Sequence, residues 1–181
     1  MSHSVLLAHG GFMIKDLLVD LGAIKFGDFT LTSGKKSTYY VDMKSAFAGS
    51  PALLKELTEE ISRRLTAGKV AGVELGAVPL VVAAAFARST PFIIIRKEGR
   101  EHGLKDPVIG AIASGEEVEI IEDVVTTGGS VLRAVNLLRS RGAVVKKVIC
   151  VVDREDGGTA LLRENGIELV PLVRISELLK K

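Results

Sequence analysis

The residues with the clearest chemical potential lie at 118–130, where an apolar run leads through two acids into a loop of hydroxyl and glycine residues. The acids are Glu122 and Asp123, and a helix is expected directly after the loop, at 129–141. At the start of a helix the backbone N–H groups have no intrahelical partner and the dipole is positive, so an anion binds well there. The segment therefore predicts a phosphate cradle with hydroxyl donors. These donors are Thr126, Thr127 and Ser130.

The two acids need a separate explanation, because carboxylates beside a phosphate would repel it. They can accept hydrogen bonds from ribose hydroxyls, or hold the waters of a magnesium ion bound to pyrophosphate. Gly128 and Gly129 let the backbone approach an anion closely. Neither the GxxxxGK[ST] loop of nucleoside triphosphatases nor the GxGxxG loop of dinucleotide-binding folds occurs in the chain. An ordinary capped turn is the alternative, but it explains one hydroxyl only, so the residues indicate a ribose that carries phosphate.

The elements that must position this cradle alternate regularly from residue 51 onward. We expect helices at 51–66, 79–88, 129–141, 159–164 and 175–180, and strands at 70–74, 92–96, 108–113, 118–121, 144–152 and 167–173. Such alternation predicts an α/β fold with a mainly parallel central sheet flanked by helices. A helix at 12–21 and a hairpin at 29–42, turning at 33–36, come first and predict a separate small N-terminal lobe.

Composition restricts the class of protein. The 181 residues, 47% of them hydrophobic, suit a single domain over 1–181, with the N-terminal lobe mainly at 12–45 and the ligand-binding core at 51–175. A net charge of +2 and an aromatic content of 4% give no reason to expect a nucleic-acid partner. No apolar run reaches the ~18 residues of a membrane span, and we recognise no targeting segment. Cys150 is the only cysteine and lies in an apolar run, which favours a cytoplasmic protein without disulfides.

The segment from Val118 to Ser130 resembles the signature with which type I phosphoribosyltransferases bind phosphoribosyl pyrophosphate (PRPP). The resemblance implies the type I phosphoribosyltransferase fold. In that family the two acids bind the ribose hydroxyls and the following loop binds the 5-phosphate. By motif position, PRPP-binding roles are implied for Glu122, Asp123, Val124, Val125, Thr126, Thr127, Gly128, Gly129 and Ser130.

Three further segments resemble the orotate phosphoribosyltransferases, especially their short archaeal-type form. Residues 25–42 correspond to the hood over the base, which implies that Lys25 binds orotate. Residues 152–155 end a strand, and Arg154 matches the residue that binds the orotate carboxylate, with Thr126 nearby. The third segment, 96–103, is a charged loop that corresponds to a mobile lid.

In the family this lid reaches into the active site of the neighbouring subunit, which implies a homodimer with shared sites. Arg100 replaces the lysine of many bacterial members, so the charge is kept but its geometry changes. The lid residues with implied PRPP-binding roles are Arg96, Lys97, Arg100 and His102. Catalytic roles are implied for Lys97, Arg100, His102 and Asp123.

These assignments have plainer alternatives. Lys25 could belong to a solvated basic hairpin, and charged loops such as 96–103 are usually solvated as well. The guanidinium of Arg154 could instead form an ion pair with Asp153 or Glu155.

The resemblance implies transfer of ribose 5-phosphate from PRPP to orotate, giving orotidine 5'-monophosphate and pyrophosphate, in de novo pyrimidine (UMP) biosynthesis. Mg²⁺ is the implied cofactor, held mainly through PRPP and water. The loop at 74–79 corresponds to the family's pyrophosphate loop but lacks the lysine of many bacterial members, so we expect no strong cationic contribution from it. Two rivals are a purine phosphoribosyltransferase and a PRPP-sensing regulator. The first needs a neutral base pocket, and the second normally needs an added nucleic-acid-binding part.

Overall fold

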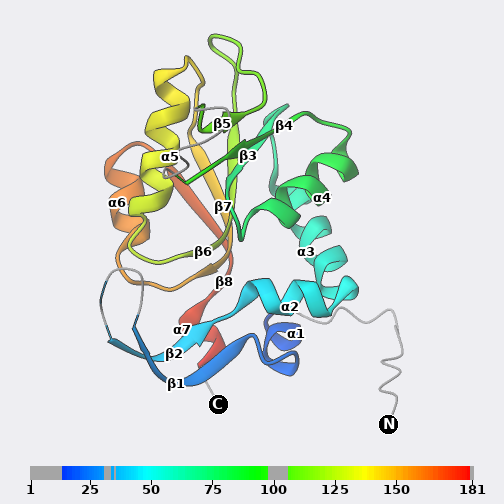
Figure 1. Ribbon diagram of the computed structural model, residues 1–181, viewed down its shortest axis with the longest axis vertical. Coiled ribbons are helices and arrows are strands. Elements are labelled where there is room, and N and C mark those ends of the chain that lie inside the picture. Colours follow the sequence, from blue (N-terminus) through cyan, green and yellow to red (C-terminus); the bar gives the residue numbers. More distant parts are fainter. Residues whose placement is uncertain (1–13, 31–33, 35, 98–105, 180–181) are drawn as a thin grey trace.

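A six-stranded sheet in the order β5-β4-β3-β6-β7-β8 forms the centre of the protein (Figure 1). The computed structural model describes residues 14–30, 34, 36–97 and 106–179. All neighbouring strands pair in parallel except β5, which runs antiparallel to β4 at one edge. The expected α/β fold with a mainly parallel sheet is therefore confirmed. The strands are β3 (Val70–Val73), β4 (Phe92–Ile95), β5 (Val108–Ile109), β6 (Glu119–Val125), β7 (Lys147–Asp153) and β8 (Glu168–Arg174).

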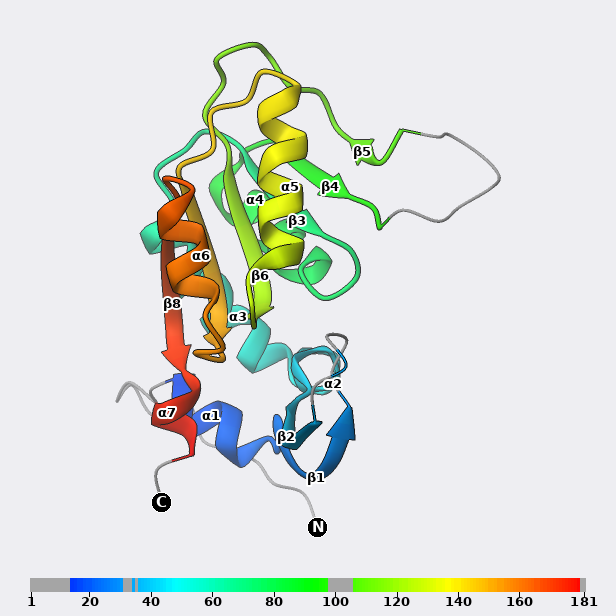
Figure 2. The ribbon, with the colours of Figure 1, turned by 90° about the vertical axis from the view of Figure 1, so that its left-hand side faces the viewer.

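Helices cover both faces of this sheet, as Figure 2 shows for α5 and α6 in front of the strands. Strand β6 shows why both faces need cover, because successive side chains of a strand point to opposite faces of the sheet. Ile120 packs into the cluster that contains Val131 of α5, and Ile121 packs into the cluster that contains Leu53 of α3. Each face of the sheet therefore has its own apolar core. The covering helices are α3 (Pro51–Arg64), α4 (Val78–Arg88), α5 (Gly129–Ser140) and α6 (Gly158–Glu164).

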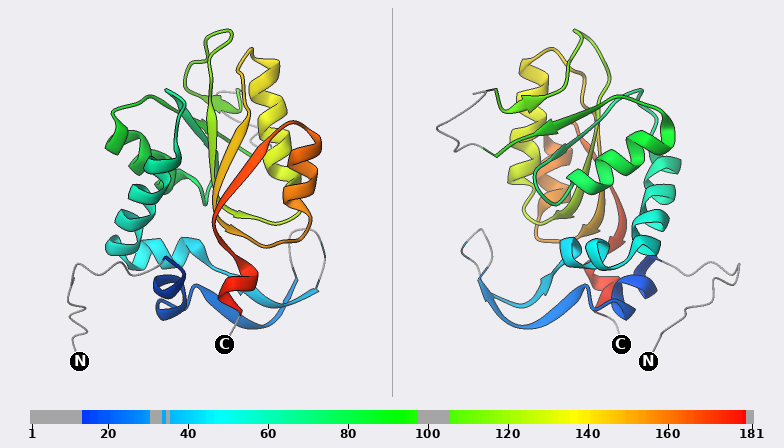
Figure 3. Two further views of the ribbon diagram at one scale, coloured as in Figure 1. Left: turned by 180° about the vertical axis from the view of Figure 1, so that it is seen from behind. Right: turned by 45° about the vertical axis from the view of Figure 1, so that its right-hand side comes forward.

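The hood lies beyond one end of the sheet, together with the C-terminal helix (Figure 3). Its strands β1 and β2 form the expected antiparallel hairpin. Leu18, Met43 and Phe47 of the hood are buried in the same apolar cluster as Leu53 and Ile175, so this interior is continuous from the hood to the α3 face of the sheet. The elements here are α1 (Ile14–Asp20), β1 (Ile24–Thr30), β2 (Lys36–Val41), α2 (Met43–Gly49) and α7 (Ile175–Leu178).

Three features differ from the sequence-based expectation. Strand β6 continues to Val125 rather than ending at residue 121, because its pairing with β7 continues, so both acids lie within the strand. Helix α2 was not expected, and it begins where Asp42 accepts a hydrogen bond from the backbone N–H of Ser45 (3.2 Å). The apolar run at 108–113 forms only the two-residue strand β5. None of the helices in the described part of the chain has the length and apolar character to span a bilayer.

Candidate active site

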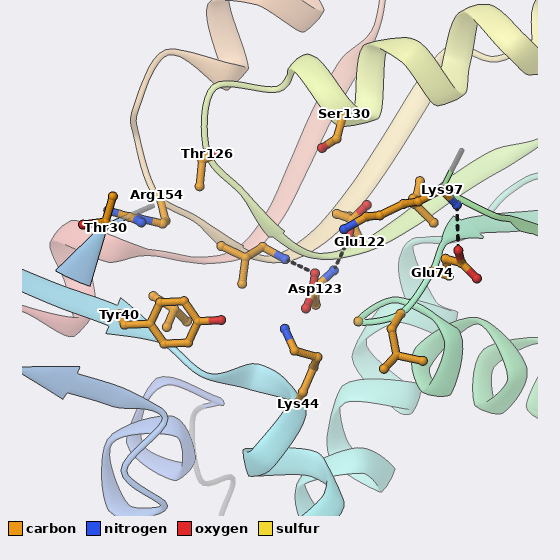
Figure 4. A pocket seen from close by; sticks show the side chains of 15 residues that line it. Thr30, Tyr40, Lys44, Glu74, Lys97, Glu122, Asp123, Thr126, Ser130 and Arg154 are labelled. Carbon is orange, nitrogen blue, oxygen red and sulfur yellow. Dashed lines mark hydrogen bonds between the residues drawn. The ribbon is translucent and has the colours of Figure 1, made fainter. Parts of the chain in front are cut away.

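A cavity of about 580 Å³ opens between the hood and the carboxyl ends of the parallel strands (Figure 4). Strand β3 has β4 on one side and β6 on the other, so the strand order reverses here. Open α/β sheets bind their ligands at such a switch point. Polar side chains from the hood and from four strand ends meet in this cavity. Its lining residues are Thr30, Tyr40, Val41, Lys44, Val73, Glu74, Leu75, Gly76, Lys97, Glu122, Asp123, Val124, Thr126, Ser130 and Arg154.

The predicted acid pair lies at the centre of the cavity wall. Glu122 is buried, and its Oε1 accepts a hydrogen bond from the backbone N–H of Asp123 (3.2 Å). The Oδ1 of Asp123 accepts from the backbone N–H of Val124 (2.9 Å). Burial and the adjacent Asp123 carboxylate raise the pKa of Glu122 well above its ordinary value, although Lys97 opposes the shift. Hydroxyl donors of a ligand would relieve this cost by hydrogen bonding to the carboxylates.

The loop after β3 lies directly against Asp123. A Cβ atom at Gly76 would lie 1.9 Å from Oδ2 of Asp123, so a larger residue would push the loop or the acid out of place. This contact joins the loop at 74–79 to the acid pair in one wall. From sequence we expected no strong cationic contribution from this loop, and the contact adds a steric reason for its glycine.

The end of the predicted cradle has the geometry of an anion site. Gly128 has a left-handed φ of 78° and lies so close to α6 that a Cβ would be 3.1 Å from the Cα of Gly158. No side chain caps the start of α5, so N–H groups of its first turn are available to a ligand. Thr126 and Ser130 line the cavity, as expected. The cavity lining does not include four other cradle residues, which are Val125, Thr127, Gly128 and Gly129.

Arg154 enters the cavity from the end of β7. It is only 6% exposed, its Nη2 donates to Oγ of Ser37 (3.3 Å), and its guanidinium carbon lies 4.6 Å from the centre of the Tyr39 ring. Its buried Nε has no hydrogen-bond partner among the described residues, and the Asp156 carboxylate is 3.5 Å away. Asp153 was an alternative ion-pair partner considered for Arg154. Its carboxylate instead accepts hydrogen bonds from the backbone N–H of Glu155 and from the hydroxyl of Thr159. These contacts hold the guanidinium of Arg154 in place, and some of its N–H groups remain available to bind a carboxylate.

The start of the charged loop differs from the expectation. Lys97 lines the cavity of its own chain, and its backbone N–H donates to Oε1 of Glu74 (2.8 Å). We expected Lys97 to complete the site of a neighbouring subunit, and that role stays a prediction. In this chain β4 ends beside β3, so Lys97 follows the strand into the local cavity. Arg96 does not line this cavity and donates to the backbone oxygen of Asp106. Arg100 and His102 lie outside the described residues.

The hood contributes different residues from the one expected. The Nζ of Lys25 lies 2.5 Å from Oδ2 of Asp42, which lowers the pKa of Asp42, and Lys25 is not part of the cavity lining. Its assignment to orotate stays a prediction. Thr30, Tyr40 and Lys44 line the cavity but were not singled out from sequence. The sequence did contain one signal for Lys44. Asp42 is a favourable residue for capping a helix, so it would have predicted α2 with Lys44 in its first turn.

The site suits a magnesium ion carried by its ligand. Among the described residues no group of three or more His, Cys, Asp or Glu side chains could hold a metal ion. Mg²⁺ commonly takes one or two carboxylates together with substrate phosphates and water. Glu122 and Asp123 can supply the carboxylates, directly or through water, while a phosphate ligand supplies the rest.

The raised pKa of Glu122 predicts a specific pH dependence of stability. The folded state binds more protons than the unfolded state between the ordinary and the raised pKa, so the free energy of unfolding falls as pH rises through that window. Glu122→Gln removes the charge and should be more stable than wild type at about pH 8, with the difference vanishing near pH 4, below the ordinary carboxyl pKa. Urea unfolding at both pH values measures this.

Glu119 in the same strand is a matched control. Burial alone would raise its pKa, but hydrogen bonds from Lys147 and Thr66 outweigh burial and lower it. Glu119→Gln should therefore be less stable than wild type at about pH 8, and the loss should shrink as pH falls through the carboxyl range. If Glu122→Gln and Glu119→Gln changed the free energy of unfolding equally at about pH 8, the two carboxyl groups would not have the different environments described above.

Comparison with known proteins agrees with this geometry. Residues 43–163 match the phosphoribosyl transferase domain family. The orotate phosphoribosyltransferase of Thermoplasma acidophilum is 57% identical over 164 residues, covering 91% of this chain and 95% of the relative.

Two solved structures have a similar fold. The orotate phosphoribosyltransferase of Aeropyrum pernix superimposes with a TM-score of 0.82 at 30% identity, covering 92% of this chain and 96% of that one. The enzyme of Mycobacterium tuberculosis H37Rv, solved in complex with PRPP, has a TM-score of 0.70 at 28% identity, covering 91% of this chain and 96% of that one. The chain therefore belongs to the phosphoribosyl transferase domain family and, within it, to the orotate phosphoribosyltransferases.

Proposed function

We propose that this protein transfers ribose 5-phosphate from PRPP to orotate, giving orotidine 5'-monophosphate and pyrophosphate, as a step of pyrimidine biosynthesis. The observation that carries the proposal is one cavity that combines the acid pair, the uncapped start of α5 and the buried fork of Arg154. Those three features match, in turn, the ribose hydroxyls, the 5-phosphate and the orotate carboxylate. A single domain and a cytoplasmic location belong to the same proposal.

The reaction is a displacement at the anomeric carbon of the ribose. Glu122 and Asp123 accept hydrogen bonds from the ribose hydroxyls and hold the ring while positive charge develops on it. Lys97 lies in the same cavity, where its ammonium stabilises the negative charge of the departing pyrophosphate. Arg154 orients orotate so that its ring nitrogen attacks, and no covalent enzyme intermediate is needed. Bound Mg²⁺ would neutralise part of the pyrophosphate charge.

We also propose a homodimer with shared sites. Phe86 is 87% exposed and Val82 is 43% exposed, and their four-residue spacing places them on one face of α4. Leu75, at 71% exposure, precedes this helix and also lines the cavity. An exposed apolar face of this kind suits a second copy of the chain, which would then lie beside the cavity. The roles of Arg96, Arg100 and His102 in the neighbouring site rest on the sequence resemblance.

An activity assay tests the proposed reaction against its rivals. The protein is mixed with Mg²⁺, PRPP and either orotate or adenine, and nucleotide and pyrophosphate are quantified. We expect equal amounts of orotidine 5'-monophosphate and pyrophosphate with orotate, and no nucleotide with adenine. Product from adenine alone would favour a purine enzyme. Binding of PRPP without either product would favour a PRPP-sensing protein.

Arg154→Ala should raise the KM for orotate by at least about 10-fold, because charge-assisted hydrogen bonds contribute ~1.5–3 kcal/mol. The KM for PRPP should change much less, since the cradle is left intact. Arg154→Lys should recover only part of the loss, because lysine keeps the charge but lacks the planar fork. Arg163→Ala, on the exposed side of α6, is the matched control. An unchanged orotate KM in Arg154→Ala would place the carboxylate site elsewhere.

A further inference from the structure

We propose that Lys44 is a further substrate-binding residue, whose ammonium group contacts the pyrophosphate of PRPP from the hood side of the cavity. The proposal rests on the proposed function, because it assigns a contact within the same reaction. No sequence motif identified Lys44 as a ligand-binding residue. Its place in the cavity depends on how the hood packs against the sheet.

The fold presents Lys44 to the cavity on a fixed support. It lies in the first turn of α2, which Asp42 caps through the backbone N–H of Ser45. Met43 and Phe47, at 1% and 5% exposure, anchor α2 in the apolar interior. Figure 4 shows the Lys44 side chain extending toward Asp123. Lys44 has no ion pair or hydrogen bond to another described residue, so its ammonium is available for a ligand.

The direction of the reaction indicates which part of PRPP lies near Lys44. Nucleophile and leaving group occupy opposite sides of the anomeric carbon in an in-line displacement. Arg154 holds the base on one side of the cavity, and Figure 4 shows Lys44 below Asp123 and away from Arg154. The side away from Arg154 is also where Gly76 meets Asp123 and where Glu74 contacts Lys97. Pyrophosphate therefore departs toward the wall that contains Lys44.

The charges in this wall show why a second cation is needed. The loop Glu74–Ala77 contributes an acid and no basic side chain, and the acid pair is immediately beside it. Pyrophosphate placed there would meet carboxylates from both directions. With Arg154 engaged by the base, Lys97 and Lys44 are the basic residues of the described lining that remain for pyrophosphate. Lys44 would offset the repulsion, and its contact would strengthen as charge develops on the leaving group.

The test compares Lys44→Ala, Lys44→Arg and the control Lys55→Ala. Lys55 is an exposed lysine of α3 that pairs with Glu59 outside the cavity. Lys44→Ala should raise both the KM for PRPP and the dissociation constant of inorganic pyrophosphate, measured calorimetrically with Mg²⁺, by about 10-fold or more. The orotate KM and the melting temperature should stay close to wild type. Lys44→Arg should restore most of the affinity, and Lys55→Ala should behave as wild type.

A second pair of variants moves the charge to the neighbouring wall. Glu74→Lys in the Lys44→Ala background should recover pyrophosphate affinity, because position 74 lines the same cavity. Glu74→Gln in that background removes the acid without adding a cation and should recover less. Unchanged pyrophosphate binding in Lys44→Ala, or parallel losses for orotate, pyrophosphate and thermal stability, would overturn the assignment. Pyrophosphate binding is measured without orotate, so a failure of wild type to use orotate would be a separate result.

Discussion

Replacing Asp123 with asparagine is expected to lower kcat/KM for PRPP by roughly 100-fold, since a charge-assisted hydrogen bond is worth ~1.5–3 kcal/mol. Asp123 lies within β6, near its carboxyl end, with Oδ1 held by the backbone N–H of Val124 and Oδ2 against Gly76. The substitution keeps the shape of the side chain, so the backbone and the loop should stay in place. What is lost is the negative charge that orients a ribose hydroxyl and stabilises the developing positive charge.

Steady-state kinetics with varied PRPP and direct PRPP binding would measure this loss. Asp20→Asn, at the exposed end of α1, is a control for charge removal away from the cavity. The melting temperature of Asp123→Asn should remain near that of wild type, which would separate loss of function from loss of fold. Near wild-type kcat/KM in the variant would refute the assignment of ribose hydroxyls to Asp123.

The parts of the site that sequence predicted are those carried by one continuous segment. The run from 118 to 130 contains a strand, two acids, a glycine turn and a helix start in order, so local rules suffice to place them relative to one another. The sheet was predictable for a similar reason, because alternating strands and helices impose a parallel arrangement. Arg154 was identified by the family resemblance, at a strand end where open parallel sheets bind ligands.

The parts that sequence missed depend on contacts between distant segments. Nothing local indicates that Lys25 pairs with Asp42, 17 residues later, or that Gly76 touches Asp123. Lys44 was overlooked because α2 has only seven residues, too few for helical periodicity to stand out from the preceding strand. The sequence did not indicate that Lys97 lines the cavity of its own chain, because a charged loop carries no signal of the side to which each residue points.

Complementation between inactive variants should show which residues act across the dimer. Arg100→Ala and Asp123→Asn homodimers are each expected to have little activity. If Arg100 serves the neighbouring site, a mixed dimer has one site with both defects and one site with neither. Random 1:1 pairing makes about half of the dimers mixed, each with one intact site of two, so about a quarter of wild-type activity should return. Mass spectrometry of tagged chains would verify that subunits exchange.

Lys97→Ala paired with Asp123→Asn gives the decisive contrast, because both residues line the cavity of the same chain. In that mixed dimer each cavity keeps one defect, so no activity should return even when exchange is complete. Recovery with Arg100→Ala but not with Lys97→Ala would place the boundary between local and shared residues after Lys97. Recovery with both variants would mean that Lys97 leaves its own cavity when substrate binds. Recovery with neither would mean that Arg100 serves its own subunit, and the shared-site proposal would fail.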